Sequence, residues 1–305
     1  MVHGMEKHES TGKVIDLTRK REYYTNGSHP RTGQSPTHTR VIAISSGKGG
    51  VGKTNIVANL GYSLSRLGRK VMILDADLGL GNLDVLLGMA PQYNLAHVVK
   101  GLKRIGEITV EGPGGMTILP ASSGIQEMTK LTQSQKIKML EELDKLIATK
   151  DILLIDTAAG ISSNVMYFNA AAQEIIIVVS PEPTSLTDAY ALIKVLSIRY
   201  GKRHFFILSN MVVNEHEGLE IYRQLKMVAD RFLKVEIVYL GHIFTDTNII
   251  KCVKKQKIIS EYFPESSASR CFNKITETIA LMNTENNRYG DSNFMWNNIF
   301  NDAYI

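Results

Sequence analysis

A glycine-rich segment with two lysines, GKGGVGKT at 47–54, is the part of the sequence best suited to bind phosphate. It follows an apolar run at 41–45 and opens a stretch with helical spacing at 53–67. In this setting G-x-x-x-x-G-K-T predicts a P-loop, because glycines let backbone amides turn toward phosphate oxygens at a helix N-terminus. A glycine-rich turn with a chance lysine is the alternative. The predicted nucleotide-binding residues are Gly47, Lys48, Gly49, Gly50, Val51, Gly52, Lys53, Thr54 and Asn55.

Aspartates follow two other apolar runs, where a metal bound to the phosphates would need them. We expect Lys53 to reach the β- and γ-phosphates and the Thr54 hydroxyl to ligate Mg²⁺. Asp156 ends the run DILLID, as a Walker B aspartate does, and is predicted to hold Mg²⁺ through a bound water. Asp75 and Asp77 end KVMILDAD and point the same way on an extended segment. Thr54, Asp156 and Asp75 are the predicted metal residues, although a strand-end turn is the alternative role for Asp75 and Asp77.

Continuous β-branched runs alternate with stretches of helical spacing along the chain. This alternation predicts an α/β fold, a mostly parallel twisted sheet of seven or eight strands with helices on both faces. The predicted helices span 53–67, 133–149, 162–172, 184–200, 217–232 and 267–283. The predicted strands span 41–45, 70–76, 116–121, 151–157, 174–180, 204–210 and 235–243.

Composition divides the chain of 305 residues into one domain and two tails. We expect a flexible polar tail at 1–39, a single nucleotide-binding domain at 40–285 and a second tail at 286–305. The net charge of +5 permits an anionic partner but selects none. The two cysteines lack metal-ligand spacing, and no signal peptide or membrane-spanning run is evident, so a cytoplasmic location is expected.

The second lysine of the loop, Lys48, gives the sequence a family resemblance. KGGVGKT with this extra lysine resembles the deviant Walker A motif of the MinD/ParA ATPases. The segments DADLGLGNLD and DTAAG are similar to the two switch segments of that family, in the same order and at the expected spacing. The resemblance covers 40–260 and implies a P-loop NTPase with a MinD-like fold that uses ATP/ADP and Mg²⁺. It implies slow ATP hydrolysis that a partner stimulates.

The resemblance also implies roles for single residues. Lys48 would cross to the partner's nucleotide in an ATP-bound homodimer, and Asp77 would position the attacking water; with Lys53 these form the catalytic set. Asn82 matches a switch asparagine at the dimer face. Asn210 matches the asparagine that reads adenine, and Pro181 and Glu182 match a loop near the nucleotide. The family commonly has proline in the loop after the last strand, and that loop contacts nucleotide in relatives. This chain has Phe244 there and so departs from the family pattern.

Within the family, the phrase LGLGNLDVLLG and the segment NLAHVVKG resemble the flagellar-number regulators called FlhG or FleN. This branch implies control of flagellar number or placement, with an FlhF-type GTPase, a C-ring protein or a flagellar transcription regulator as partner. The alternative is a MinD/ParA-type positioning or partition ATPase that acts at the division site or on DNA. A third reading is a binding module that has lost catalysis, which the presence of Lys53, Thr54, Asp77 and Asp156 disfavours.

Two peripheral segments suggest surfaces. In 286–305 the apolar residues around Trp296 could form one face of an amphipathic helix that docks at the inner face of the membrane, or a tail that packs on its own domain or on a protein. That tail has no lysine beside its apolar residues. Lys251, Lys254, Lys255 and Lys257 form a basic cluster, for which a solvated helix face is favoured over DNA binding.

Overall fold

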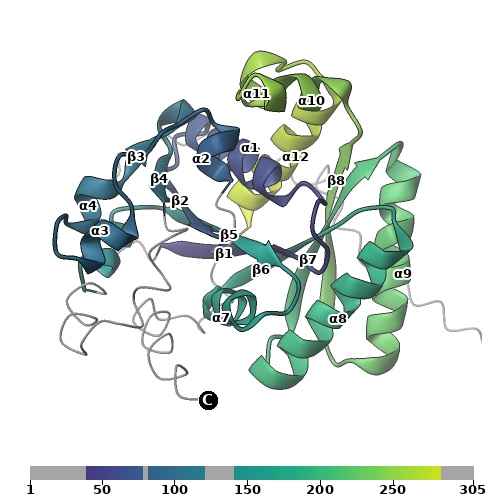
Figure 1. The fold of residues 1–305 in the computed structure, drawn as a ribbon. Helices are drawn as coiled ribbons and strands as arrows, with labels where there is room; N and C mark the ends of the chain where they lie inside the picture. Colours follow the sequence, from purple (N-terminus) through teal and green to yellow (C-terminus); the bar gives the residue numbers. More distant parts are fainter. Residues whose placement is uncertain (1–38, 78–81, 121–140, 283–305) are drawn as a thin grey trace, which may run out of the picture. The chain divides into compact units, whose positions relative to one another are not determined.

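A computed structural model describes residues 39–77, 82–120 and 141–282. These residues form one sheet of eight strands in the order β3-β4-β2-β5-β1-β6-β7-β8, with helices on both faces (Figure 1). The predicted fold class is therefore confirmed. The strands are β1 (Arg40–Ser46), β2 (Val71–Ala76), β3 (Val110–Glu111), β4 (Thr117–Pro120), β5 (Ile152–Ala159), β6 (Glu174–Val179), β7 (His204–Val212) and β8 (Glu236–Phe244).

All neighbouring strands run parallel except β3, which pairs antiparallel with β4 at one edge. Parallel strands bring their C-terminal ends to the same edge of the sheet. In the centre, β5 lies between β1 and β2, with Asp156 opposite both Ile44 and Asp75. The register thus places the ends of β1, β2 and β5 side by side, where the sequence puts its P-loop and its aspartates.

The helices divide between the two faces of the sheet. Alternate residues of β1 enter different clusters, Ile42 and Ile44 on one side and Val41 and Ala43 on the other, so both faces are buried. The helices are α1 (Lys53–Arg66), α2 (Leu83–Leu86), α3 (Leu95–Val99), α4 (Ile105–Ile108), α7 (Ser163–Ala171), α8 (Pro183–Tyr200), α9 (Glu215–Phe232), α10 (Thr247–Lys254), α11 (Ile259–Tyr262) and α12 (Ser267–Leu281); residues 141–147 are also helical.

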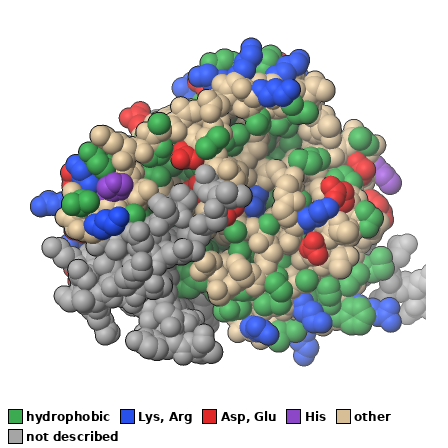
Figure 2. All heavy atoms as spheres, viewed as in Figure 1, with side chains coloured by type: hydrophobic (Ala, Val, Ile, Leu, Met, Phe, Trp, Pro, Cys, Tyr) green, Lys and Arg blue, Asp and Glu red, His purple; other side chains and the backbone are tan. Residues whose placement is uncertain are grey.

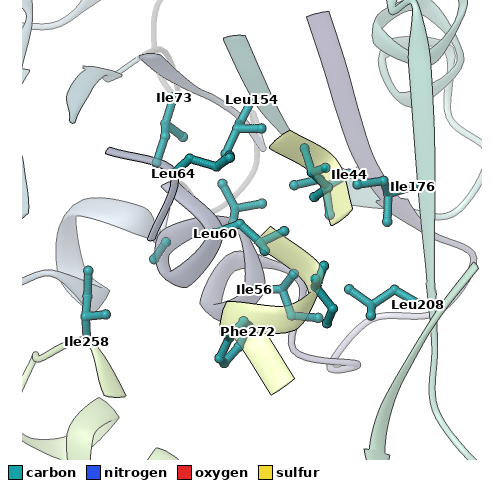
Figure 3. Packing of buried hydrophobic residues seen from close by; sticks show 14 of the residues in the cluster. Ile44, Ile56, Leu60, Leu64, Ile73, Leu154, Ile176, Leu208, Ile258 and Phe272 are labelled. Carbon is teal, nitrogen blue, oxygen red and sulfur yellow. The ribbon is translucent and has the colours of Figure 1, made fainter. Parts of the chain in front are cut away.

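Helix α1 lies between the sheet and α12, and it carries the P-loop on its N-terminus. Its residues Ile56, Leu60 and Leu64 are fully buried and face strand residues on one side and Phe272 of α12 on the other (Figure 3). At Gly61 an added Cβ would lie 2.6 Å from the Cδ1 of Ile73, so α1 sits directly on β2. This packing fixes the direction in which the helix N-terminus points.

Two further observations concern the described residues. Cys252 and Cys271 are both buried and unpaired. In the described ranges, no helix has the length and apolar character that a bilayer crossing would need. The predicted tails at 1–39 and 286–305 lie outside the described residues, apart from Thr39.

Candidate functional site

The P-loop joins the end of β1 to the start of α1, near the middle of the sheet (Figure 1). Gly50 and Gly52 have positive φ angles of 80° and 88°, a backbone region that glycine enters without strain. An added Cβ at Gly49 or Gly50 would meet nothing within 4 Å, so this stretch of backbone faces open space. A loop of this shape can present its amides to an anion at the N-terminus of a 14-residue helix.

The other glycine of the loop, Gly47, is needed because of what lies behind it. A Cβ at Gly47 would lie 2.1 Å from the carbonyl carbon of Asp188 and 2.6 Å from the nitrogen of Ala189, both backbone atoms of α8. The P-loop therefore rests directly on the backbone of α8. The Ser46 hydroxyl adds support from within the loop by donating to the Lys48 carbonyl at 2.8 Å.

Asp156 and Asp75 lie opposite each other at the ends of β5 and β2, and both are buried. Burial raises the pKa of Asp156 to about 7, against the opposing effects of the Lys53 charge and a hydrogen bond with Thr54. Burial also raises the pKa of Asp75 to about 6, although this carboxylate accepts hydrogen bonds from the backbone amides of Asp77 and Leu83. The cluster therefore concentrates negative charge in a place where solvent does little to stabilise it.

The residues present fit a magnesium ion coordinated together with phosphates. Asp156 Oδ1 is buried and has no hydrogen-bond partner among the described residues, which is unusual for a carboxylate oxygen. Thr54 contacts the same carboxyl group. Nowhere in the described ranges do three or more His, Cys, Asp or Glu side chains gather as a complete metal site. Mg²⁺ commonly takes one or two protein ligands and completes its shell with water and substrate phosphates, so this sparse set suits it.

The predicted switch residues stand next to this cluster. Asp77 directly follows β2, and its amide donates to Asp75 Oδ1 at 3.2 Å. Asn82 precedes α2, is exposed and makes no side-chain cap to that helix. The four residues between them, 78–81, lie outside the described residues. The structure thus brings Asp77 next to the carboxylates of Asp75 and Asp156 and leaves the Asn82 side chain at the surface.

Asn210 near the end of β7 is tied to the P-loop. Its Nδ2 donates to the Val51 carbonyl at 2.7 Å, and a Cβ at Gly52 would lie 2.5 Å from the same nitrogen. Because this bond uses the amide as a donor, Oδ1 remains an acceptor. The next residue, Met211, has a positive φ of 61°, which is uncommon outside glycine. Sequence reasoning did not find this bond, which fixes the loop against β7.

Lys48 pairs within its own chain. Its Nζ contacts the Glu182 carboxylate and donates to the Thr184 hydroxyl at 2.9 Å, at the start of α8. Both charged side chains are partly exposed, so the pair adds little to stability. The structure therefore unites Lys48 with Glu182, next to Pro181, and adds Thr184, which the sequence analysis missed. Thr184 follows Pro183 in a polar stretch, and nothing in its spacing signals this contact.

Asn55 has a different environment from the rest of the predicted phosphate site. Its side-chain oxygen accepts from Asn59 Nδ2 at 3.1 Å, one turn further along α1. The side chain of Asn59 also accepts from the Ser260 amide and hydroxyl on α11. Asn55 thus begins a chain of polar contacts that leads from the phosphate end of α1 to α11.

Comparison with known proteins assigns the family. Residues 39–204 match the model described as an AAA domain. The chain is 45% identical to the antiactivator FleN of Pseudomonas aeruginosa, over 79% of this chain and 86% of FleN. It is 36% identical to the flagellum site-determining protein YlxH of Helicobacter pylori, over 78% of this chain and 81% of YlxH. The septum site-determining protein MinD of Pyrococcus horikoshii, solved as a complex with Mg-ADP, is 27% identical with a TM-score of 0.64, covering 80% and 97% of the two chains.

A P-loop, a buried aspartate pair and a sheet of this order, together with these relatives, define the class of protein: the chain belongs to the MinD/ParA family of P-loop ATPases. It is therefore an ATPase. Within the family it is similar to the FlhG/FleN flagellar regulators, which confirms the branch indicated by the sequence.

Proposed function

We propose that the chain is a nucleotide-driven switch in the cytoplasm that controls flagellar number or placement. ATP closes a homodimer, and hydrolysis opens it. The observation that carries the proposal is the meeting of an open P-loop with a buried, unpartnered oxygen of Asp156, next to Lys53 and Thr54. The flagellar relatives favour this output over the positioning or partition role of the wider family.

Several residues of the chain hold the triphosphate and its metal in this proposal. The loop amides and Lys53 bind the phosphates, while Thr54 and Asp156 hold Mg²⁺ and Asp75 adds charge behind them. The metal, when bound, neutralises phosphate charge and orients the terminal phosphate. Asp77 lies beside Asp75 and orients the attacking water. Burial raises the pKa values of both carboxyls, which disfavours their ionised forms. Cations in the site would stabilise the ionised forms by charge.

Lys48 is the residue that makes hydrolysis depend on a second chain. Its contacts to Glu182 and Thr184 are near the surface. Exchanging these contacts for a phosphate of the nucleotide bound by a second chain therefore has a small energetic cost. There the ammonium would offset charge that develops on the transferred phosphate. Asn82, exposed beside α2, would contact the same second chain. A monomer therefore binds ATP but lacks one catalytic cation.

The adenine would lie beside Asn210, with Pro181 and Glu182 on the neighbouring loop. Asn210 donates to the P-loop, which leaves its Oδ1 to accept from the exocyclic amine of adenine. Phe244, where the family commonly has proline, ends β8 and packs its ring 4.7 Å from that of His242. The position of Phe244 against the core gives it a packing role.

Flagellar proteins are the partners that this function requires: an FlhF-type GTPase, a C-ring protein or a flagellar regulator that raises the slow basal turnover. The tail at 286–305 would bring the dimer to the inner face of the membrane, since two weak amphipathic anchors bind much better than one. Binding to DNA is not part of this proposal.

The variant Lys48→Ala tests the proposal. It should bind Mg-ATP with an affinity close to that of the wild type, remain monomeric in light scattering and release phosphate at least about 100-fold more slowly. Lys145→Ala, which removes an exposed lysine far from the loop in sequence, is the matched control and should behave like the wild type. Normal turnover by Lys48→Ala would refute the need for a lysine from a second chain.

A further inference from the structure

The outer side of α10 and α11 combines exposed apolar side chains with lysines. The exposed fractions are 59% for Ile250, 41% for Val253, 50% for Tyr262 and 39% for Phe263. Figure 2 shows Lys and Arg side chains gathered with hydrophobic ones over this part of the molecule, at the top of the view. We call this the α10–α11 surface; it consists of Ile250, Val253, Tyr262, Phe263, Lys251, Lys254, Lys255 and Lys257.

The core does not use these apolar side chains. The inner side of α10 and α11 is held by Cys252, Ile258 and Ile259, all buried in the cluster that also contains α1 and α12. At its start, α10 is capped by Asp246, which accepts from the Asn248 amide at 2.9 Å and from Ser267 on α12. The helix is therefore firmly fixed from inside, and the outward apolar groups remain available for another contact.

Lysines dominate the charge of this surface, although α11 also carries the exposed Glu261 next to Tyr262. The segment 250–257 reads IKCVKKQK and contains no acidic residue. Within the helix, Ile250, Val253 and Lys254 share a face, with Lys251 at its side. Lys257 Nζ lies 5.5 Å from the centre of the Tyr262 ring, so one lysine covers an aromatic side chain of the surface. Lysines whose stems border apolar side chains can place their ammonium groups among anions while the apolar groups are buried.

We propose that the α10–α11 surface docks on an anionic phospholipid membrane, with the lysines at the headgroup phosphates and the apolar side chains at the level of the glycerol backbone. Charge complementarity supports this partner. Lysine is depleted in the cores of protein interfaces, which disfavours a protein partner. Nucleic acid would use the lysines but would gain nothing from burying Ile250 and Val253. The proposal concerns different residues from the tail at 286–305 and does not rest on the proposed flagellar role.

Two polar contacts connect this surface to the phosphate site. Gln256, in the turn after α10, has a positive φ of 58° and donates from Nε2 to the Val85 carbonyl of α2 at 2.9 Å. A Cβ at Gly88 would lie 3.1 Å from the Gln256 side chain, so the two segments are in close contact. On the other side, Ser260 donates to Asn59 of α1. The surface is thus fastened both to the helix after the switch segment and to the helix that carries the P-loop.

The test is cosedimentation of the full chain with vesicles of 30% phosphatidylglycerol in phosphatidylcholine, with pure phosphatidylcholine vesicles for comparison. A surface variant replaces Lys251, Lys254, Lys255 and Lys257 with glutamine. A control variant replaces four exposed lysines elsewhere with glutamine: Lys100, Lys145, Lys194 and Lys234. Both variants change the net charge from +5 to +1, because each removes four positive charges (5 − 4 = 1). Basal ATPase activity and the circular dichroism spectrum should be unchanged in both.

We expect the surface variant to lose about 100-fold in partitioning to anionic vesicles, and the control to lose much less. A polarity-sensitive dye on Ile250→Cys should shift to the blue on anionic vesicles, since Cys252 and Cys271 are buried and leave the new thiol as the reactive one in the described part of the chain. Equal binding by the surface variant and the wild type would overturn the proposal, as would equal losses in both variants. Loss of duplex DNA binding without loss of vesicle binding would assign the surface to nucleic acid instead.

Discussion

Replacing Asp156 with asparagine should stabilise the nucleotide-free protein, and increasingly so as the pH rises. The carboxyl is almost fully buried, one of its oxygens has no hydrogen-bond partner in the described structure, and burial raises its pKa to about 7. Between its unfolded and folded pKa values, the folded state binds more protons than the unfolded state, so stability falls as the pH rises. Asparagine cannot ionise, and the variant lacks this loss.

The size of the effect follows from the two pKa values. With about 3.8 in the unfolded state and about 7 in the folded state, ionisation of Asp156 lowers stability by roughly 2 kcal/mol at pH 5 and roughly 4 kcal/mol at pH 8. The advantage of Asp156→Asn over the wild type should therefore grow by about 2 kcal/mol between these two pH values. Differences that do not depend on pH, such as changed packing, cancel in this comparison.

The assay is urea unfolding at pH 5 and pH 8, in EDTA and without nucleotide, followed by circular dichroism. In a separate series at pH 8 without EDTA, Mg-ATP should raise the midpoint of the wild type more than that of the variant, because the variant would lack the carboxylate proposed to hold Mg²⁺. If the stability difference between variant and wild type were the same at both pH values, the carboxyl would not be the source of the destabilisation.

Two further changes test the packing of the site and of the α10–α11 surface. Gly47→Ala places a methyl group 2.1 Å from the carbonyl carbon of Asp188, so it should displace the loop and weaken Mg-ATP binding about 100-fold in calorimetry. Gly106→Ala, which meets nothing within 4 Å, should bind normally, and equal affinity of all three proteins would contradict the argument. Asp246→Ala removes the N-cap of α10 and should lower the free energy of unfolding by about 1 kcal/mol in urea; an unchanged midpoint would show that the cap is unimportant.

The sequence predicted most of the secondary structure because its apolar runs are long and clearly bounded. All seven predicted strands are present within a few residues, for example β1 at Arg40–Ser46 for the run at 41–45. The helix predicted at 133–149 falls partly outside the described residues and is helical at 141–147. The strand β3 was missed, since two residues show no periodicity. The predicted domain and tail boundaries remain predictions.

The candidate site was predictable in its composition but less so in its contacts. Motif spacing identified the residues of the P-loop and the aspartates, and sheet register explains why they meet. Spacing could not reveal that Lys48 pairs with Glu182 and Thr184, or that Asn210 donates to the loop, because these bonds join segments more than 130 residues apart. Such contacts depend on the order of strands in the sheet, which the sequence analysis left open. The assigned catalytic roles remain predictions.

The close approach of Gly47 to Asp188 couples the position of the P-loop to that of α8. Helix α8 has 18 residues, which corresponds to a length of about 27 Å, and its far end carries the exposed side chains of Ile198 and Tyr200. A protein that bound this far end and tilted the helix would shift the α8 backbone against which the P-loop packs. Such a protein would control nucleotide release from the far end of α8, without contact to the nucleotide.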